Sequence, residues 1–357
     1  VSAIGMMLFT SRPVGDAMAT TIWGTSSSWT LTALPLFVWM GEILFRTKLS
    51  ENLFKGLSPW MQKLPGGLIH VNVVGCALFA AISGSSAATV ATVGKMSIPE
   101  LRKRNYPEKI LLGSLAGSGT LGLLIPPSII LIIYGVAVQE SIAKLFIAGI
   151  IPGIMIALIF MSYVIIWSLI NKKSMPKIIE EYSFLEKIKR SKQLLPVIIL
   201  ILAVIGSIYT GIATATEAAS LGVVGALILS YFQKSLTLKT FKSSLLGATK
   251  TSCMIAFILA GSTFLSLAMG FTGLPRNLAL WIQNMELSPY VLIFVLMIFY
   301  IILGMFLDGI SAVVLTMAII EPMIRQAGFD MIWFGIFLVI VVEMAQITPP
   351  VGFNLFV

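Results

Sequence analysis

The stretch 120-TLGLLIPPS-128 places two adjacent prolines, Pro126 and Pro127, inside an apolar run that continues on both sides. A proline in a helix interior removes a backbone donor and costs about 3 kcal/mol. A second pair, Pro349-Pro350, lies in 347-ITPPVGFNLF-356. We interpret both pairs as deliberate breaks in membrane-depth helices, which are tolerated only where protein or a water-filled cavity satisfies the freed backbone groups.

The composition is too apolar for a water-soluble domain. The chain is 57% hydrophobic and 11% charged, with a mean hydropathy of +0.98, whereas average soluble domains carry about 25% charged residues. Runs such as 143–170 and 289–307 reach or approach the ~20 residues needed to cross a bilayer. We therefore expect an all-α polytopic membrane protein, and we expect it to be a fragment that lacks part of a helix at each end.

The net charge of +9 gathers in loops between the apolar runs. This distribution follows the positive-inside rule for cytoplasmic loops better than it indicates nucleic-acid binding. The basic loops are 46–63, 95–109, 171–193 and 234–250. Since the loops on both sides of 66–98 are basic, we expect that segment to be a re-entrant hairpin with its tip at Ser83–Ser86.

The same reasoning predicts a second hairpin over 289–322, opening to the opposite face, with its tip near Asp308. A shift of 223 positions places Pro99 on Pro322, Ser85 on Asp308 and the first Pro-Pro pair on the second. These matches indicate inverted-topology repeats, each with a re-entrant hairpin and a broken helix, the latter over 108–139 and 331–357. Broken helices at matching positions of two halves point to a midplane transport site.

The residues around the first tip and break are rich in neutral oxygens. The prolines free carbonyls near Gly122–Leu124, and hydroxyls or a tight turn come from Ser83, Gly84, Ser85, Ser86, Thr89, Ser118, Thr120 and Ser128. Such ligands suit a weakly held monovalent cation, because a divalent ion favours carboxylates. The half-helix N-termini at tips and breaks also favour an anionic group.

The second half repeats this chemistry with Gly304, Asp308, Gly309, Ser311 and Thr348. An ionisable residue at membrane depth is a functional candidate. We interpret Asp308 as taking part in ion binding or coupling, with a helix cap as the alternative.

Other polar residues receive plainer interpretations. Glu343 either faces the core or pairs with another group. Glu42 is expected to reach the interface, Glu217 to cap a helix after Thr216, and His70 to lie at the interface. We expect amphipathic helices that lie along the membrane interface at Trp60 and Trp281.

The small residues Gly117-Ser118-Gly119 are expected to allow close helix contact rather than phosphate binding. We expect both cysteines, Cys76 and Cys253, to be small buried hydrophobic residues.

Several motifs, taken in order, resemble the large membrane subunit of TRAP (tripartite ATP-independent periplasmic) transporters. They are 83-SGSSAAT-89, 119-GTLGLLIPPSIILIIYG-135, 145-LFIAGIIPG-153, 214-TATEAAS-220, 306-FLDGISAVVL-315 and the ITPP stretch. The resemblance implies a sodium-coupled importer of organic acid anions, such as a C4-dicarboxylate or sialic acid, in a bacterial or archaeal inner membrane. It also implies an elevator-type fold, a periplasmic substrate-binding protein and a small four-helix membrane subunit as partners, and no nucleic acid.

The resemblance assigns roles to segments and residues. It implies scaffold helices with an interfacial arm in 1–64 and 141–288, and transport-core repeats in 65–140 and 289–357. It places one sodium site at Ser83, Gly84, Ser85, Ser86, Thr120, Gly122, Ile125 and Pro126, and another at Gly304, Asp308, Ser311, Thr348 and Pro349. It places the substrate near Ser86, Ser128 and Gly309.

Three alternatives remain open on the residues alone. A stand-alone sodium–dicarboxylate symporter has the same two-hairpin plan. An intramembrane aspartyl protease needs two facing acids, and Asp308 has no acidic partner in a recognisable motif. A channel is disfavoured by two opposed hairpins. We therefore expect no enzyme activity, no catalytic residue, no transition metal and no cofactor other than Na⁺ as the coupling ion.

Overall fold

The computed structural model describes residues 2–47, 49–176, 182–284 and 288–356. Every regular element in those ranges is helical, so the predicted all-α class is confirmed. The helices form one large connected apolar core and a small satellite core where α1 meets the far end of α13.

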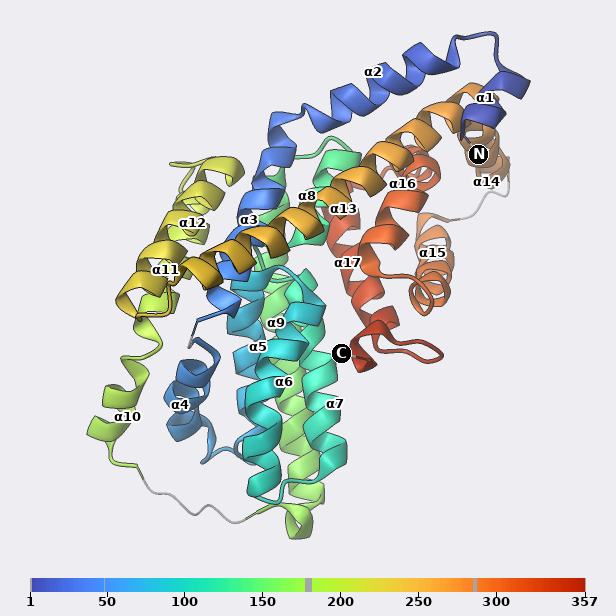
Figure 1. Cartoon of the computed structure of the whole chain (residues 1–357). Coiled ribbons are helices and arrows are strands. Elements are labelled where there is room, and N and C mark those ends of the chain that lie inside the picture. Colours follow the sequence, from blue (N-terminus) through green and yellow to red (C-terminus); the bar gives the residue numbers. More distant parts are fainter. Residues whose placement is uncertain (1, 48, 177–181, 285–287, 357) are drawn as a thin grey trace.

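One group of helices is arranged along the long helix α13, which crosses the molecule diagonally (Figure 1). α3 packs against α12 and the first half of α13, while α1 and α2 lie along its second half. The bounds are α1 (Ser2–Phe9), α2 (Val14–Ser26), α3 (Ala33–Phe45), α11 (Leu195–Tyr209), α12 (Ala215–Phe232) and α13 (Leu238–Thr272), with the 3₁₀ turn η1 (Trp29–Thr32) before α3.

A second group is a bundle built from the first hairpin, the first broken helix and α9. α5 packs against α6 and α7, and α9 covers the broken helix. The bounds are α5 (Ile69–Ser83), α6 (Ser86–Lys103), α7 (Glu108–Gly119), the 3₁₀ turn η2 (Thr120–Leu123), α8 (Ile129–Ala137) and α9 (Ile142–Ile170).

The third group holds the corresponding C-terminal elements. α15 and α16 both pack against α17, and α14 packs against α16. The bounds are α14 (Leu274–Asn284), α15 (Pro289–Gly304), α16 (Gly309–Gln326), α17 (Met331–Gln346) and the 3₁₀ turn η4 (Phe353–Leu355).

Within the part of the chain that the structure describes, four helices are long and apolar enough to cross a membrane: α9, α12, α13 and α16. Two further spans arise if each bent pair of helices, α2 with η1–α3 and α10 (Phe184–Ser191) with α11, is counted as one span. Three more apolar helices, α5, α15 and α17, are shorter. Short helices are what a re-entrant hairpin or a broken span requires, because each covers only part of the bilayer.

Several predicted boundaries were wrong. Residues 234–250 were expected to be a loop, but α13 begins at Leu238, where Thr237 and Thr240 form a capping box. Both hairpins were expected to end near Pro99 and Pro322. Instead α6 and α16 continue through these prolines to Lys103 and Gln326. Charge located the loops, but it carries no information about where a capped helix starts.

Two short helices lie within the basic loops. α4 (Leu49–Met61) is the helix expected at Trp60, and α10 (Phe184–Ser191) was not predicted. They are joined by a hydrogen bond of 2.7 Å from Trp60 Nε1 to Ser191 Oγ. The other expected amphipathic helix corresponds to α14, although the side chain of Trp281 lies outside the described residues.

Candidate functional site

The first hairpin tip lies directly on the first helix break. Gly84 ends α5 in the left-handed conformation, with φ +61°, and its carbonyl accepts a 3.2 Å hydrogen bond from the amide of Ile129. A Cβ on Gly84 would lie 2.7 Å from the carbonyl oxygen of Pro127, and a Cβ on Gly122 would lie 2.6 Å from that of Ser85. Tip and break therefore meet backbone to backbone, and glycine is required on both sides of the contact.

The hydroxyls of the first tip bond mainly to one another and to the tip backbone. Thr89 Oγ1 donates to the Ser85 carbonyl at 2.8 Å and lies 2.9 Å from Ser83 Oγ. Ser85 caps α6 by accepting from the amide of Ala88. Ser83 and Thr89 are buried, Thr89 completely, and Ser85 is partly buried. The cluster therefore brings several neutral oxygens together at the tip.

The break itself is closed by side chains on its own segment. Ser128 caps α8 by accepting from the Leu131 amide and donates to the Leu123 carbonyl, one of the groups expected to be free. Thr120 donates to the Gly117 carbonyl at 2.7 Å. On the outside, a Cβ on Gly149 of α9 would lie 2.9 Å from the Leu124 carbonyl. The sequence therefore located the break, but Ser128 already occupies one of its oxygens.

The second tip is organised by Asp308. This residue is the N-cap of α16, and its carboxylate accepts from the amides of Ile310 and Ser311 and from Ser311 Oγ at 2.6 Å. The capping alternative is therefore confirmed as a contact that Asp308 makes. Asp308 is only partly buried, and its one carboxylate is shared among three donors at the tip of the hairpin.

The second tip rests on the end of α17, although the expected residues do not all meet. A Cβ on Gly304 would lie 2.6 Å from the Ala345 side chain, and one on Gly309 would lie 2.9 Å from Gln346 Nε2. Thr348 is directed elsewhere, because its exposed hydroxyl donates to the Met344 carbonyl at 2.6 Å. The contacts thus join Gly304 and Gly309 to α17 and leave Thr348 on its own turn.

Gln346 joins the two halves and was missed by sequence reasoning. Its side-chain oxygen accepts a 3.0 Å hydrogen bond from Ser86 Oγ at the start of α6, and its amide nitrogen lies at Gly309 at the start of α16. Ile130 of α8 also reaches Gly309. The N-termini of α6, α8 and α16 therefore converge around one buried amide, and converging N-termini favour negative charge. The available signal was a polar residue at the apolar end of α17.

Glu343 faces the core one turn before Gln346. It is 3% exposed, and its Oε1 has no hydrogen-bond partner among the residues that the structure describes. The sequence left this orientation open. A buried carboxylate with one unsatisfied oxygen is costly, so Glu343 is an additional candidate site residue.

The plainer interpretations had mixed outcomes. Glu217 does cap α12, but its capping-box partner is Thr214 rather than Thr216. His70, expected at the interface, is fully buried within the protein, with Nε2 at 2.8 Å from the Pro65 carbonyl. Cys76 is buried as expected, whereas Cys253 is exposed.

The small residues of the glycine-rich stretch do serve packing. A Cβ on Gly119 would lie 2.0 Å from Val90 of α6, and one on Gly117 would lie 3.2 Å from Phe160 of α9. Among the described residues, no three His, Cys, Asp or Glu side chains gather as a metal cluster.

Two cavities lie at opposite ends of the helix assembly. The first, called the basic cavity here, has a volume of about 1480 Å³ and is lined by α3, α4, α6, α10 and the start of α13. Its lining includes Glu100 and Glu186 and a larger set of bases: Arg46, Lys55, Lys95, Arg104, Arg190, Lys234 and Lys239. This excess of positive charge suits an anion.

The second, called the hydroxyl cavity, has a volume of about 640 Å³ between α2, the end of α8, α13 and α16. Its lining includes Glu140, Glu321 and a set of hydroxyls: Thr20, Thr21, Thr25, Ser28, Thr30, Ser262, Thr263 and Ser266. Ser262 Oγ donates to the Val314 carbonyl at 2.6 Å, which joins α13 to α16 at this end.

Comparison with known proteins gives the family. The family model for the DctM component of the tripartite ATP-independent periplasmic transporter matches residues 1–357. The C4-dicarboxylate TRAP transporter large permease protein DctM of Pseudomonas aeruginosa is 33% identical, over 99% of this chain and 82% of that protein.

Other relatives carry different substrate names. The sialic acid TRAP transporter large permease protein SiaM of Vibrio cholerae is 30% identical, over 99% of this chain and 83% of its own length. The isethionate TRAP transporter permease protein DctMQ of Oleidesulfovibrio alaskensis is 31% identical, over 97% of this chain and 54% of its length. The chain therefore belongs to the DctM family of tripartite ATP-independent periplasmic transporters and is a multi-pass protein of the cell inner membrane.

Proposed function

We propose that this chain is the membrane subunit of a sodium-coupled secondary transporter that imports organic acid anions by an elevator-type alternating-access mechanism. The observation that carries the proposal is the junction at Gln346, where the two halves meet through Ser86 and Gly309. A site shared by two interrupted halves can be exposed to either side when those halves move relative to a scaffold.

The cation would be held by neutral oxygens at the tips and breaks. At the first site these are the Ser83, Ser85 and Thr89 oxygens beside the break at Gly122. At the second site Asp308 adds one carboxylate beside Ser311. A set with few full charges suits Na⁺, which must be released in every cycle, better than a divalent ion.

The anion would lie near the convergent N-termini of α6, α8 and α16. Ser86, Ser128 and Gly309 are the first residues of these helices or their caps, and Gln346 supplies an adaptable amide between them. Cation binding would favour anion binding, because the same tip and break form both sites.

The two cavities support alternating access. By the positive-inside rule the basic cavity faces the cytoplasm and the hydroxyl cavity faces the periplasm. The basic cavity is the larger of the two, and on this ground we assign the structure to an inward-facing conformation. Movement of α6, α8, α16 and α17 against α3 and α13 would close one opening and enlarge the other.

The relatives support the partners and the substrate class. Their names include C4-dicarboxylate, sialic acid and isethionate, all acids that are anionic at neutral pH. The protein named DctMQ extends well beyond the matched part, which fits a fused small subunit. For this chain we propose a small four-helix membrane subunit and a periplasmic binding protein that delivers the anion.

Uptake into proteoliposomes tests the proposal. Vesicles that contain this chain and its small subunit, supplied with the binding protein, should accumulate labelled succinate or N-acetylneuraminate only under an inward sodium gradient. Equal uptake when choline replaces Na⁺ would contradict sodium coupling. Equal uptake without the binding protein would instead indicate a stand-alone symporter.

A further inference from the structure

We propose that Arg46 receives the carboxylate of an organic anion in the basic cavity, and that Glu42 holds this guanidinium until the anion arrives. The identity of the anion rests on the proposed function, whereas the roles of the two residues rest on the contacts between α3 and α13. Glu42 was expected only to reach the interface. It is in fact half-buried against α13 and paired with Arg46.

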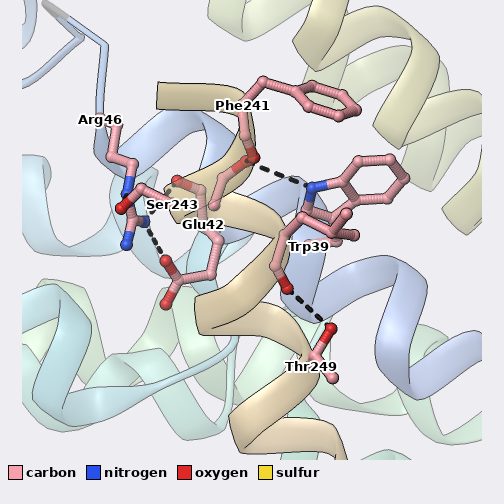
Figure 2. A network of polar contacts seen from close by, with 8 residues as sticks. Trp39, Glu42, Arg46, Phe241, Ser243 and Thr249 are labelled. Carbon is pink, nitrogen blue, oxygen red and sulfur yellow. Dashed lines mark hydrogen bonds and ion pairs between the residues drawn. The ribbon is translucent and has the colours of Figure 1, made fainter. Parts of the chain in front are cut away.

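Arg46 lies at the C-terminus of α3, one turn after Glu42 (Figure 2). It also lines the basic cavity. Its Nη1 donates to the Glu42 carboxylate and, at 2.9 Å, to the Glu42 carbonyl, and its Nε donates to Ser243 Oγ at 3.1 Å. Its Nη2 has no hydrogen-bond partner among the described residues. The guanidinium is therefore only partly used by the protein.

Glu42 is positioned by a glycine on the neighbouring helix. A Cβ on Gly247 of α13 would lie 2.6 Å from Glu42 Oε2 and 3.1 Å from Oε1. The absence of a side chain at Gly247 thus allows the carboxylate to lie against the α13 backbone. There it neutralises Arg46 while the cavity is empty of anion.

The two helices do not depend on this ion pair for their contact. Trp39 Nε1 donates to Ser244 Oγ at 3.3 Å, and the Trp39 ring packs on Phe241 with centroids 5.8 Å apart (Figure 2). Arg46 can therefore change its partner without separating α3 from α13. That is the property required of a residue that binds and releases a ligand.

The exposure of the pair makes the exchange feasible. The side chains of Arg46 and Glu42 are 24% and 27% exposed, and contact with water weakens an ion pair relative to a fully buried one. An incoming carboxylate can offer the guanidinium a bidentate contact of the same chemistry. Excess positive charge in the lining raises the local anion concentration.

The cavity also reaches the helix that leads from the proposed anion site. Its lining includes Thr92 and Lys95 of α6, and α6 starts at Ser86. An anion leaving the junction at Ser86 along α6 therefore enters the same space that Arg46 borders. Arg46 is thus placed on the release side of the site rather than in it.

Direct binding tests this inference without transport. The purified full chain is titrated with succinate, and with N-acetylneuraminate, by calorimetry. Compared with wild type, Glu42→Gln should bind one of these anions about fivefold more tightly, because the competing carboxylate is gone. Arg46→Gln should bind it about fivefold more weakly. The affinity of Arg46→Lys should lie between those of wild type and Arg46→Gln, because lysine keeps the charge but lacks the planar guanidinium fork.

Lys63→Gln is the matched control, since Lys63 is an exposed base that does not line the cavity. It should leave the affinity unchanged. Unchanged affinity in Arg46→Gln, weaker or equal binding in Glu42→Gln, or no binding of either anion to any of these proteins would overturn the assignment. Failure of the proposed function would appear separately, as loss of sodium-dependent uptake by the wild-type protein.

Discussion

Ser86 donates a 3.0 Å hydrogen bond to Gln346, although 260 positions separate the two residues in the chain. Both side chains are almost completely buried, at 4% and 2% exposure. The bond ties the start of α6 in the first half to the end of α17 in the second. Any motion that carries both halves as one body must preserve it, and any motion between the halves must break it.

We expect Gln346→Ala to lower sodium-driven uptake by about tenfold, because it leaves the buried Ser86 hydroxyl unpaired at a cost of about 1–3 kcal/mol. Uptake and thermal unfolding should be measured together with Ser86→Ala and the double variant. If the bond matters, the effects of the single variants should be non-additive. Gln193→Ala, at an exposed position, is the control. Additive losses would show that the two side chains act independently.

Gly122→Ala should reduce the free energy of unfolding by about 1–3 kcal/mol, because its Cβ would collide with the Ser85 backbone and force tip and break apart. Uptake should fall with it. Gly113→Ala in α7 is the matched control: it is the same substitution, but the new Cβ meets nothing within 4 Å. That variant should be as stable as wild type or more so, since alanine favours helix. Equal behaviour of the two variants would contradict the close contact between tip and break.

Asp308→Asn separates capping from ion binding. Asparagine caps helices about as well as aspartate, so stability should change by less than about 0.5 kcal/mol. Loss of the charge should raise the sodium concentration for half-maximal uptake by about tenfold if Asp308 is a sodium ligand.

Asp330→Asn provides a closely matched control for this test, because Asp330 caps α17 by accepting from the Trp333 amide at 2.8 Å. It should leave the sodium response unchanged. An identical sodium response in both variants would remove Asp308 from the cation site and leave it as a cap.

Glu343→Gln should stabilise the protein or leave it unchanged while reducing uptake by about tenfold or more. Glutamine has the same shape but carries no charge, so it removes the cost of burying a carboxylate whose Oε1 is unsatisfied. Glu108→Gln, at an exposed ion pair with Arg102, is the control. A destabilised Glu343→Gln protein with normal specific uptake would indicate a structural carboxylate.

Local chemistry explains what the sequence could predict. Proline acts within a few residues, so the breaks at Pro126 and Pro349 were predicted from the local sequence, and the tip at Gly84 was predicted from the basic loops on both sides of its hairpin. The Gln346 junction was not, because a polar residue at the end of an apolar helix marks a candidate but does not name its partner 260 residues away. Thr214 and Thr216 are equally good caps by residue type, and only the chain path selects Thr214.

The basic cavity could not be predicted for a related reason. Its bases belong to loops and helices far apart in the sequence, and their charge had been explained by the positive-inside rule. That rule assigns a side of the membrane but does not say whether the bases enclose a volume. Likewise, the position of Glu42 depends on Gly247 of α13, more than 200 residues away.

Tyr106 gives a test of pH dependence in the turn between α6 and α7. Its hydroxyl accepts a 3.0 Å hydrogen bond from the Leu68 amide, and burial raises the pKa of the phenol above its ordinary value. The folded state therefore keeps Tyr106 neutral at a pH where the unfolded chain, with a pKa of about 10, begins to ionise. Its contribution to stability is fully present below pH ~10 and is lost as the pH rises through the folded-state pKa.

Tyr106→Phe should be about 1 kcal/mol less stable than wild type at pH 8, because the Leu68 amide loses its partner. The gap should narrow as the pH rises above about 10, since phenylalanine does not ionise and only the wild-type protein loses this contribution. Thermal unfolding of both proteins from pH 8 to pH 11 measures the difference, in which the titration of all other groups cancels. A gap that stays constant would show that the phenol ionises equally easily in the folded and unfolded states, and a gap that widens would show that it ionises more easily in the folded state; either result would contradict the raised pKa.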